Sequence, residues 1–443
     1  MHRLAACAGH ILGASDVVEK EIGANSDWQG PLAGIKVLDL TQMVSGPMGA
    51  QILGDQGADV IKVEAIGGAA ERGSARSLMT NPLFTVVNRN KRSVAIDLSK
   101  PKGAAVFLKM VSNADVVLQN FRPGVVERMK ISYNDLKAVN PQLIYMSISG
   151  FGPTGPYSQK RVYDPVVQAV SGLSSIQADE TGRPRMMRLI VPDKITALTS
   201  AQAISTALVQ KYRTGKGTHI NLSMVDAVVS FEWAEAFARE TFVMPSESMP
   251  EREYTRDMVF ETKDGKFIAA GAVQDKEWIG MSAALDKPEW LTQERFKTAA
   301  ARNINRAERL DAQAEEIKKF DSEDIMARMN KHQVPNGPVN HPREKVLEDP
   351  QVVHNDLIFR TKHPNAPFML RQPRPAAQFS SSPFELSRHA PLLGQHTREV
   401  LLSLGISDEE VDQLMREKVV HEAVAKIADP TKTDARKLGV TSG

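Results

Sequence analysis

The sequence predicts an α/β protein in which a large domain with a mainly parallel sheet is joined by a smaller domain. Three observations support this prediction. Strands rich in Val and Ile alternate with helices through the first half of the chain, a long helix follows them, and the character of the sequence changes after residue 225. Apolar strands without strict alternation are typical of a sheet buried on both faces, and repeated strand–helix–strand units are typical of α/β folds.

The first strand–helix–strand unit begins at Gly34. The segment GIKVLDL (34–40) predicts a strand, and a Gly/Pro turn and a short helix follow it. Gly57 ends the helix, and ADVIKVE (58–64) predicts the second strand. The same pattern recurs as a strand over 93–98, a helix from Pro101 to about Ser112, and strands over 114–120, 143–149 and 218–224.

Residues 192–213 predict the clearest helix of the chain. Small and apolar residues recur there at helical spacing, Pro192 occupies the start, and basic residues with Gly215 mark the end. Asp193 therefore falls in the first helical turn, where the helix dipole favours a carboxylate. In the same way, Pro165 at a first helical position makes Asp164 a candidate N-cap.

Four segments make up the predicted domain organisation. Residues 1–29 are expected to form a flexible N-terminal extension, and residues 30–225 the first part of the large domain. Residues 226–333 carry three of the four tryptophans, a hairpin signal and charged amphipathic helices, so we assign them to a small domain. The turn-rich segment VPNGPVN then begins a return to the large domain over 334–443.

Composition excludes several classes of protein. The 55 basic and 53 acidic residues give a net charge of +2, which argues against a dedicated nucleic-acid-binding protein. The single cysteine excludes a disulfide framework, and no His spacing indicates a metal site. No apolar run approaches the roughly 18 residues of a membrane span, and the N-terminus lacks a targeting pattern. We therefore expect a cytoplasmic protein without a metal ion.

The turn after the first strand does not carry a dinucleotide fingerprint. It reads VSGPMGAQ, with Gly46 and Gly49, where a Rossmann site requires G-x-G-x-x-G, so NAD(P) is not predicted. The turn can still place backbone N–H groups near a ligand at the carboxyl edge of the sheet. Nearby, NRNKRS places Arg89, Lys91 and Arg92 before a strand, either to contact phosphates or as a solvated basic loop.

Two further segments carry candidate functional side chains. QNFRPGVVERM (119–129) follows a strand and combines amide, aromatic and guanidinium groups, which suit a nucleotide ligand; the alternative is a plain turn followed by a helix charge. In QADETGRP (177–184), Asp179 and Glu180 lie on a predicted tight turn. Each could be a nucleophile, a base or a loop charge.

Taken in order, the motifs resemble the class III CoA-transferases, the CaiB/BaiF type that includes formyl-CoA transferase and alpha-methylacyl-CoA racemase. The resemblance runs from about Pro31 to about Leu414 and rests on GIKVLDLTQMVSGPMGAQ, NRNKRSVAIDL, NFRPGVVERM, GFGPTGPY, YDPVVQAVSGL and LGQHTREVL. It implies a Rossmann-like large domain built from both chain ends, an inserted smaller α+β domain and an interlocked homodimer. It also implies coenzyme A and acyl-CoA as substrates, a carboxylic acid as acceptor, and no prosthetic group, nucleic acid or membrane partner.

The resemblance assigns roles by position. It places Gln42 near the reacting thioester. Its candidates for the CoA phosphates are Arg72 or Arg76, with Lys91 and Arg92. It lines the path of the adenine and pantetheine with Asn120, Phe121, Arg122 and Arg128.

The transferases of the family use an aspartate nucleophile in a loop that ends D-G-x-P. Here Gly182 and Pro184 place Thr181 at that position, and two acids precede it. We favour Asp179 as the nucleophile, with Glu180 as the second candidate. The basic residues that follow in this loop, Arg183, Arg185 and Arg188, suit a dicarboxylic acid or are simply surface charges.

Two other functions stay open at this point. The racemases of the family pair a His with an Asp; the matching positions here are Tyr163 and Asp193. A tyrosine is a poor base at neutral pH because its pKa is about 10, which leaves a one-base isomerase or lyase that uses Asp193. The third possibility is a CoA-binding dimer without catalysis.

Overall fold

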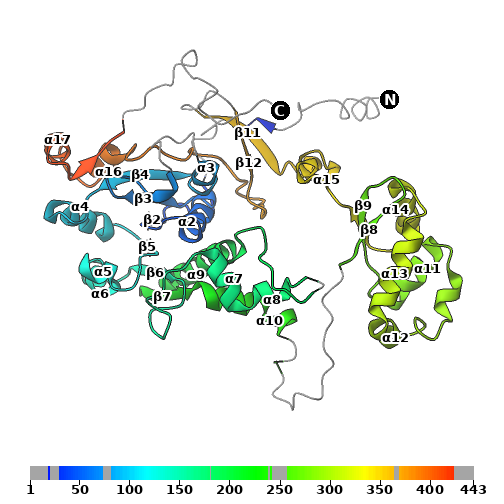
Figure 1. The fold of residues 1–443 in the computed structure, drawn as a ribbon. Coiled ribbons are helices and arrows are strands. Elements are labelled where there is room, and N and C mark those ends of the chain that lie inside the picture. Colours follow the sequence, from blue (N-terminus) through cyan, green and yellow to red (C-terminus); the bar gives the residue numbers. More distant parts are fainter. Residues whose placement is uncertain are drawn as a thin grey trace, which may run out of the picture. The chain divides into compact units, whose positions relative to one another are not determined.

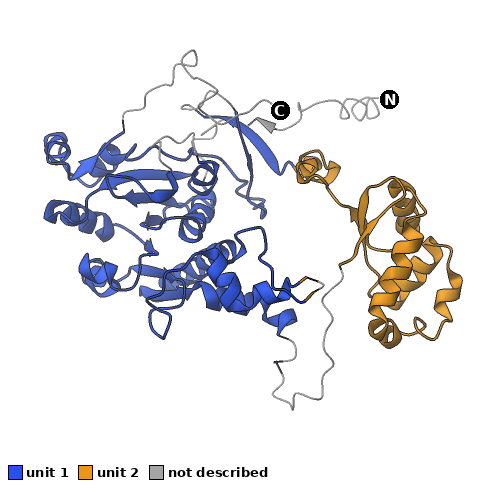
Figure 2. Ribbon diagram, in the orientation of Figure 1, with its two compact units in different colours: residues 1–178, 182–243, 356–443 blue, residues 179–181, 244–355 orange. Residues whose placement is uncertain are grey.

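A computed structural model describes residues 18–19, 29–72, 81–179, 181–237, 240–241, 257–363 and 369–423. The chain forms two compact units, shown in Figure 2. The first contains residues 1–178, 182–243 and 356–443, and the second contains residues 179–181 and 244–355. Most of the predicted N-terminal extension, Arg76 and Glu180 lie outside the described residues.

Among the described residues, the first unit holds a seven-stranded sheet of order β13-β4-β3-β2-β5-β6-β7. The strands are β2 (Lys36–Asp39), β3 (Asp59–Glu64), β4 (Lys91–Ile96), β5 (Val116–Gln119), β6 (Ile144–Ser149), β7 (Thr218–Ser223) and β13 (Val420–His421). Every neighbouring pair is parallel except β13 with β4. The prediction of an α/β fold with a parallel-dominated sheet is confirmed.

Helices cover both faces of this sheet (Figure 1). In the described part of the first unit, the helices are α2 (Ser45–Asp55), α3 (Pro82–Val87), α4 (Pro101–Ser112), α5 (Val125–Arg128), α6 (Tyr133–Val139), α7 (Asp164–Ser171), α8 (Leu173–Ile176), α9 (Val191–Thr214), α10 (Met224–Ala236), α16 (Thr397–Ser403) and α17 (Asp408–Arg416). Alternate residues of one strand face opposite sides: Val37 joins the core with α2 and α9, and Leu38 joins the core with α4 and α16. Double burial explains why these strands are apolar throughout.

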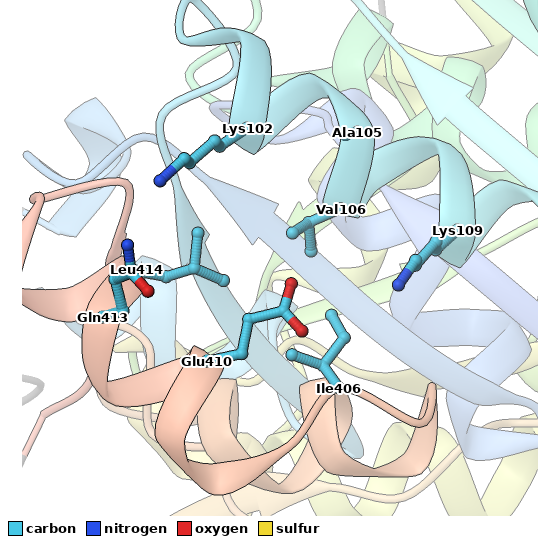
Figure 3. Close-up of a pocket in the computed structure, with 8 residues that line it drawn as sticks. All are labelled: Lys102, Ala105, Val106, Lys109, Ile406, Glu410, Gln413 and Leu414. Atoms are coloured by element: carbon cyan, nitrogen blue, oxygen red, sulfur yellow. The ribbon is translucent and has the colours of Figure 1, made fainter.

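The C-terminal part of the chain completes the first unit. Strand β13 extends the sheet beside β4, and α17 packs near α4. A groove of about 310 Å³ runs between these two helices, with Lys102 and Lys109 on one side and Glu410 on the other (Figure 3). Beside the sheet, β11 (Ile358–Lys362) pairs with β12 (Met369–Pro373) and with β1 (Val18–Glu19).

The second unit has its own core of aromatic and aliphatic side chains. Trp278 and Trp290 stack at 5.5 Å between ring centroids, and Phe296 packs edge-on against them. The elements are strands β8 (Val259–Glu261), β9 (Phe267–Ala270) and β10 (Asn336–Pro338), and helices α11 (Asp275–Ala284), α12 (Ala299–Ile304), α13 (Arg306–Ile317), α14 (Ser322–Lys331) and α15 (Pro350–His354). The predicted hairpin turn lies between β8 and β9, where Gly265 has a φ of 71°.

The limits of the second unit differ from those expected from the sequence. Helix α10 carries Trp233, yet it belongs to the first unit because Val228 packs with Val167 and Ile195. At the other limit, β10 pairs with β9, so the segment that starts at residue 334 still belongs to the second unit. The second unit continues to Asn355. Tryptophan content and turn residues could not reveal these tertiary contacts.

Candidate active site

The large sheet has a topological switch point between β2 and β5. From β2 the chain builds β3 and β4 on one side, and β5, β6 and β7 follow on the other side. Open α/β sheets bind ligands at the carboxyl ends of the strands where the order reverses. The segments that leave these two ends contain Gln42 and Asn120.

The structure joins Gln42 and Asn120 directly. The backbone N–H of Gln42 donates to Oδ1 of Asn120 at 2.9 Å, and Nδ2 of Asn120 donates to the carbonyl oxygen of Gln42 at 2.8 Å. The Gln42 side chain is exposed, and the next residue, Met43, has a φ of 68°. A left-handed conformation is uncommon outside glycine and is frequent at functional turns.

The loop after Asn120 presents the remaining residues of the predicted CoA path. The backbone N–H of Phe121 donates to Oε1 of Gln119 at 2.8 Å, and the Phe121 ring packs partly against the core. Arg122 and Arg128 are exposed. A cavity of about 360 Å³ adjoins this loop, with Phe121 and Arg122 among its lining residues. These side chains are accessible to a ligand.

Asp193 lies where the N-termini of three helices meet. Its carboxylate accepts hydrogen bonds from the hydroxyl and the backbone N–H of Ser45, the first residue of α2. Its own backbone N–H donates to Oδ2 of Asp164, the first residue of α7, at 3.2 Å. The other oxygen of Asp164 accepts from Nε2 of Gln168 at 2.6 Å. Since Asp193 lies in the first turn of α9, helices α2, α7 and α9 converge on two neighbouring carboxylates.

This environment makes Asp193 a weaker acid than an ordinary aspartate. Burial and the nearby charge of Asp164 raise its pKa to about 6, and the two hydrogen bonds from Ser45 only partly offset them. A carboxyl group with a pKa near the working pH can take up and release protons. Asp193 lies in the first turn of the helix, as predicted. Its raised pKa is not explained by that position, because a helix N-terminus favours the charged carboxylate.

Arg72 and Arg92 are engaged in ion pairs within the first unit. The guanidinium of Arg72 is buried and binds both oxygens of Glu64, at 2.7 and 2.6 Å. Arg92 pairs with Asp59 at 2.6 Å and with Glu399 at 2.9 Å. These contacts hold the 3-10 turn Ala70–Arg72 and helix α16 to the sheet, which favours structural roles over phosphate binding.

The motif NRNKRS is not a surface loop. Arg89 pairs with Asp55 at 2.7 Å and is buried, and Lys91 pairs with Asp39 at 2.8 Å with no exposed surface. This corrects the interpretation of a solvated basic loop. A phosphate ligand needs an accessible donor, so the burial of Lys91 argues against phosphate contact in this conformation.

The candidate nucleophile Asp179 forms a local turn. Its Oδ1 accepts from the backbone N–H of Thr181 at 3.0 Å and from the Thr181 hydroxyl at 2.6 Å, an arrangement typical of an Asx turn. Gly182 follows with a φ of 78°. The tight turn expected here is present, and the role of Asp179 stays a prediction.

Two features of the site were not found from the sequence. Asp164 is the first residue of α7 and Tyr163 is its N-cap, so the predicted cap was displaced by one residue. The carboxylate of Asp164 instead accepts a hydrogen bond from the backbone N–H of Asp193. Nothing in the local sequence indicates that contact. Lys62, in the middle of the apolar segment ADVIKVE, was a signal of buried charge. Lys91 lies in the polar segment NRNKRS, which gave no such signal.

Neither a metal site nor a membrane span emerges from the described residues. No group of three or more His, Cys, Asp or Glu side chains there could hold a metal ion. Within the same residues, every helix is too short or too polar to cross a bilayer.

Comparison with known proteins points to one family. CoA-transferase family III matches residues 32–397. Succinyl-CoA:glutarate CoA-transferase of Homo sapiens is 33% identical over 398 residues, covering 88% of this chain and 90% of that protein. Formyl-CoA:oxalate CoA-transferase of Streptomyces coelicolor is 30% identical over 416 residues, covering 88% and 99%. A CaiB/BaiF family protein from Brucella suis has a TM-score of 0.72 at 30% identity, covering 85% of this chain and 100% of that one.

These matches agree with the fold and with the order of the motifs. The family match spans most of the chain, and the relatives are matched over nearly their full length. The resemblance drawn from the motifs is confirmed. The chain belongs to CoA-transferase family III, of the CaiB/BaiF type, and is an enzyme that transfers CoA between acyl-CoA and acids.

Proposed function

We propose that this enzyme moves CoA from an acyl-CoA to a free dicarboxylic acid, with the thioester bound beside Gln42. The observation that carries the proposal is the pairing of Gln42 with Asn120 at the switch point of the sheet. The exposed amide of Gln42 thereby adjoins the loop of Phe121, Arg122 and Arg128, which would contact the rest of the CoA molecule.

Two observations support a dicarboxylic acceptor. Glutarate and oxalate, in the names of the relatives, are both dicarboxylic acids. In this chain, Arg183, Arg185 and Arg188 follow the candidate nucleophile and are exposed in the described part of the loop. A guanidinium can bind a carboxylate through two parallel hydrogen bonds, so one of these side chains would bind the acceptor's second carboxylate.

We infer that the reaction proceeds through covalent intermediates on Asp179, with Glu180 as the second candidate. The carboxylate attacks the thioester carbon and expels CoA thiolate, which leaves a mixed anhydride. The thiolate attacks the enzyme's carbonyl carbon, releases the first acid and forms an enzyme–CoA thioester. The acceptor carboxylate then attacks the enzyme–CoA thioester, expels CoA thiolate and forms a second mixed anhydride. The thiolate attacks the acceptor's carbonyl carbon, which releases the acceptor's CoA thioester and restores the enzyme carboxylate. No water enters, and the thioester bond energy is conserved.

Trapping distinguishes this route from direct transfer. Enzyme is incubated with succinyl-CoA and then with borohydride, and the peptide that carries Asp179 and Glu180 is analysed by mass spectrometry. Reduction of the thioester would convert one carboxyl group to an alcohol. Asp179→Asn should abolish this product and CoA exchange, and Glu180→Gln should retain both. An unmodified peptide with full exchange activity would contradict the covalent route, and the reverse mutant pattern would assign Glu180.

The resemblance also leads us to propose an interlocked homodimer. Its test is the molar mass in solution. Light scattering coupled to size-exclusion chromatography should give about twice the 48.6 kDa of one chain, without dissociation on dilution. A monomer with full exchange activity would contradict the dimer.

A one-base isomerase is the second candidate, and the raised pKa of Asp193 favours it. An isomerase would exchange the alpha proton of the acyl group with solvent in the absence of any acceptor acid. Incubation of a 2-methylacyl-CoA in deuterium oxide measures this directly. Deuterium uptake that is lost in Asp193→Asn would support the isomerase, and CoA exchange without uptake would support the transferase.

A further inference from the structure

A layer of fully buried charges adjoins residues 40–44, which join β2 to α2 and are called the Gln42 turn below. The proposed chemistry does not use these charges. Asp39 on β2, Lys62 on β3 and Lys91 on β4 lie on three neighbouring strands, and each has no exposed surface. Lys91 pairs with Asp39 at 2.8 Å, and Lys62 pairs with buried Glu71 at 3.2 Å. Because a buried ion pair seldom adds net stability over apolar packing, this layer invites another explanation.

Both lysines contact the backbone of the segment that joins β2 to α2. Nζ of Lys62 donates to the carbonyl oxygen of Thr41 at 3.0 Å. Nζ of Lys91 donates to the carbonyl oxygen of Pro47, in the first turn of α2, at 2.8 Å. Asp39 accepts from the backbone N–H of Thr41 at 2.9 Å and from its hydroxyl. The segment is thus fixed on both sides of Gln42.

Fixing is needed because the segment is strained and crowded. Met43 has a φ of 68°, which costs a non-glycine residue on the order of 1 kcal/mol. A Cβ atom on Gly46 would lie 2.3 Å from Cβ of Thr41, so the first turn of α2 rests directly on Thr41. A strained turn persists where its surroundings determine it, and here the surroundings are the two lysines and Asp39.

We propose that Lys91 and Lys62 are positioning residues for CoA transfer, which hold the Gln42 turn in the conformation that receives the thioester. This inference rests on the proposed role of Gln42. The two lysines touch neither substrate nor reacting atoms; they act through Thr41 and the start of α2. A displacement of about 1 Å at a reacting centre can lower turnover about 100-fold, so loss of either lysine should be visible in catalysis.

The hydrogen bonds of Lys91 give the proposal a pH signature. Its three acceptors are Oδ2 of Asp39, the carbonyl oxygen of Pro47 and Oδ1 of Asn88, each at 2.8 Å. An ammonium group has three donors, and a neutral amine has two. Deprotonation therefore removes one of the three contacts and loosens the turn.

Deprotonation of Lys91 falls within the range of an enzyme assay. Burial, aided by the charge of Lys62, lowers its pKa to about 8, against the opposing effects of Asp39 and Glu71. Between pH 8 and its ordinary value of 10.5, the unfolded chain binds more protons at this site than the folded chain does. The contribution of Lys91 to stability thus rises with pH in this window, while the positioning is lost. Activity and stability should move in opposite directions.

The test compares the wild-type enzyme with Lys91→Met and Lys62→Met. Lys211→Met serves as a matched control, because Lys211 pairs with Asp115 at 2.7 Å beside the amino end of β5, away from the turn. Succinyl-CoA:glutarate exchange is measured from pH 6 to pH 10, and calorimetric titration with free CoA counts the binding-competent sites. We expect kcat per competent site to fall about 100-fold in both variants, KM for succinyl-CoA to change less than threefold, and the control to match the wild type.

The pH profile separates positioning from simple loss of folded protein. Wild-type kcat should decline above about pH 8 with an unchanged circular dichroism spectrum, and Lys91→Met should lack this decline. If Lys91→Met does not fold, Asn88→Ala, which keeps the ion pair and removes one acceptor, should still lower kcat. Variants with wild-type kcat per site, or a flat wild-type profile to pH 10, would overturn the proposal. A wild-type enzyme without exchange on any acyl-CoA and acid pair would instead contradict the proposed function.

Discussion

Gln42 and Asn120 are 78 positions apart in the sequence, and each satisfies the other's polar groups through two hydrogen bonds of 2.9 and 2.8 Å. One residue leaves β2 and the other leaves β5, the two strands between which the order of the sheet reverses. The Asn120 side chain thereby acts on the backbone of Gln42, so the shape of one loop depends on the side chain of another.

Replacing Asn120 by Ala should lower activity more than stability. The change removes both hydrogen bonds, each worth about 1 kcal/mol, and leaves the backbone of Gln42 without its partner. We expect kcat/KM for acyl-CoA to fall about tenfold or more, the equivalent of at least about 1.4 kcal/mol. Asn113→Ala, an exposed amide after α4 in the same unit, is the control for asparagine loss. Equal kcat/KM in the two variants would contradict a role for the pairing.

Arg72 and Arg128 should respond to substitution in opposite ways. Arg72→Met breaks a buried ion pair with Glu64 and a contact at 4.1 Å with the Phe84 ring, so the free energy of unfolding should fall by about 3 kcal/mol. KM of the protein that stays folded should be unchanged. Arg128 is exposed, and Arg128→Met should raise KM for acyl-CoA about fivefold, or about 1 kcal/mol, without changing stability. Denaturant unfolding measures the stability of each variant, and initial rates measure its KM. A higher KM in Arg72→Met would instead indicate that Arg72 contacts CoA.

Asp193→Asn should stabilise the enzyme above pH 6. A carboxyl group whose folded pKa is raised from 3.8 to about 6 binds more protons in the folded than in the unfolded chain within that window. The wild-type protein therefore loses stability as pH rises from 4 to 6, and a neutral amide does not. The melting temperatures of the two proteins should be similar near pH 4 and should diverge in favour of the variant by pH 8. A variant that is less stable than the wild type at pH 8 would show that the charged form of Asp193 is not destabilised in the folded protein.

Gly49→Ala should separate the two helices that carry Ser45 and Asp193. A Cβ atom at position 49 would lie 2.2 Å from Oγ of Ser200 and 3.2 Å from the carbonyl oxygen of Ala197 on α9. Overpacking of this kind costs about 1–3 kcal/mol, measurable by denaturant unfolding. Gly67→Ala is the matched control, because a Cβ there meets nothing within 4 Å. Ser200→Gly in the Gly49→Ala background should restore part of the loss, and no restoration would place the strain elsewhere.

The order of strands and helices in the large domain could be predicted from the sequence because local patterns encode it. Apolar Val- and Ile-rich segments predicted the strands, and Pro192 with Gly215 marked the ends of the longest helix within one residue. The family could be recognised for a related reason, since the motifs occur in one order along the chain. Both kinds of information are carried by neighbouring residues.

Only the tertiary structure decided which of these residues meet. Nothing local indicates that Asn120 completes the turn at Gln42, that Asp164 lies beside Asp193, or that Lys91 reaches Pro47. Burial also depends on what packs above a residue, which is why NRNKRS reads as a basic surface and yet contains an ammonium group with no exposed surface. The sequence by itself determined the elements and the family. The positions and charges of the candidate site depend on contacts between distant segments, and these exist only once the sheet has assembled.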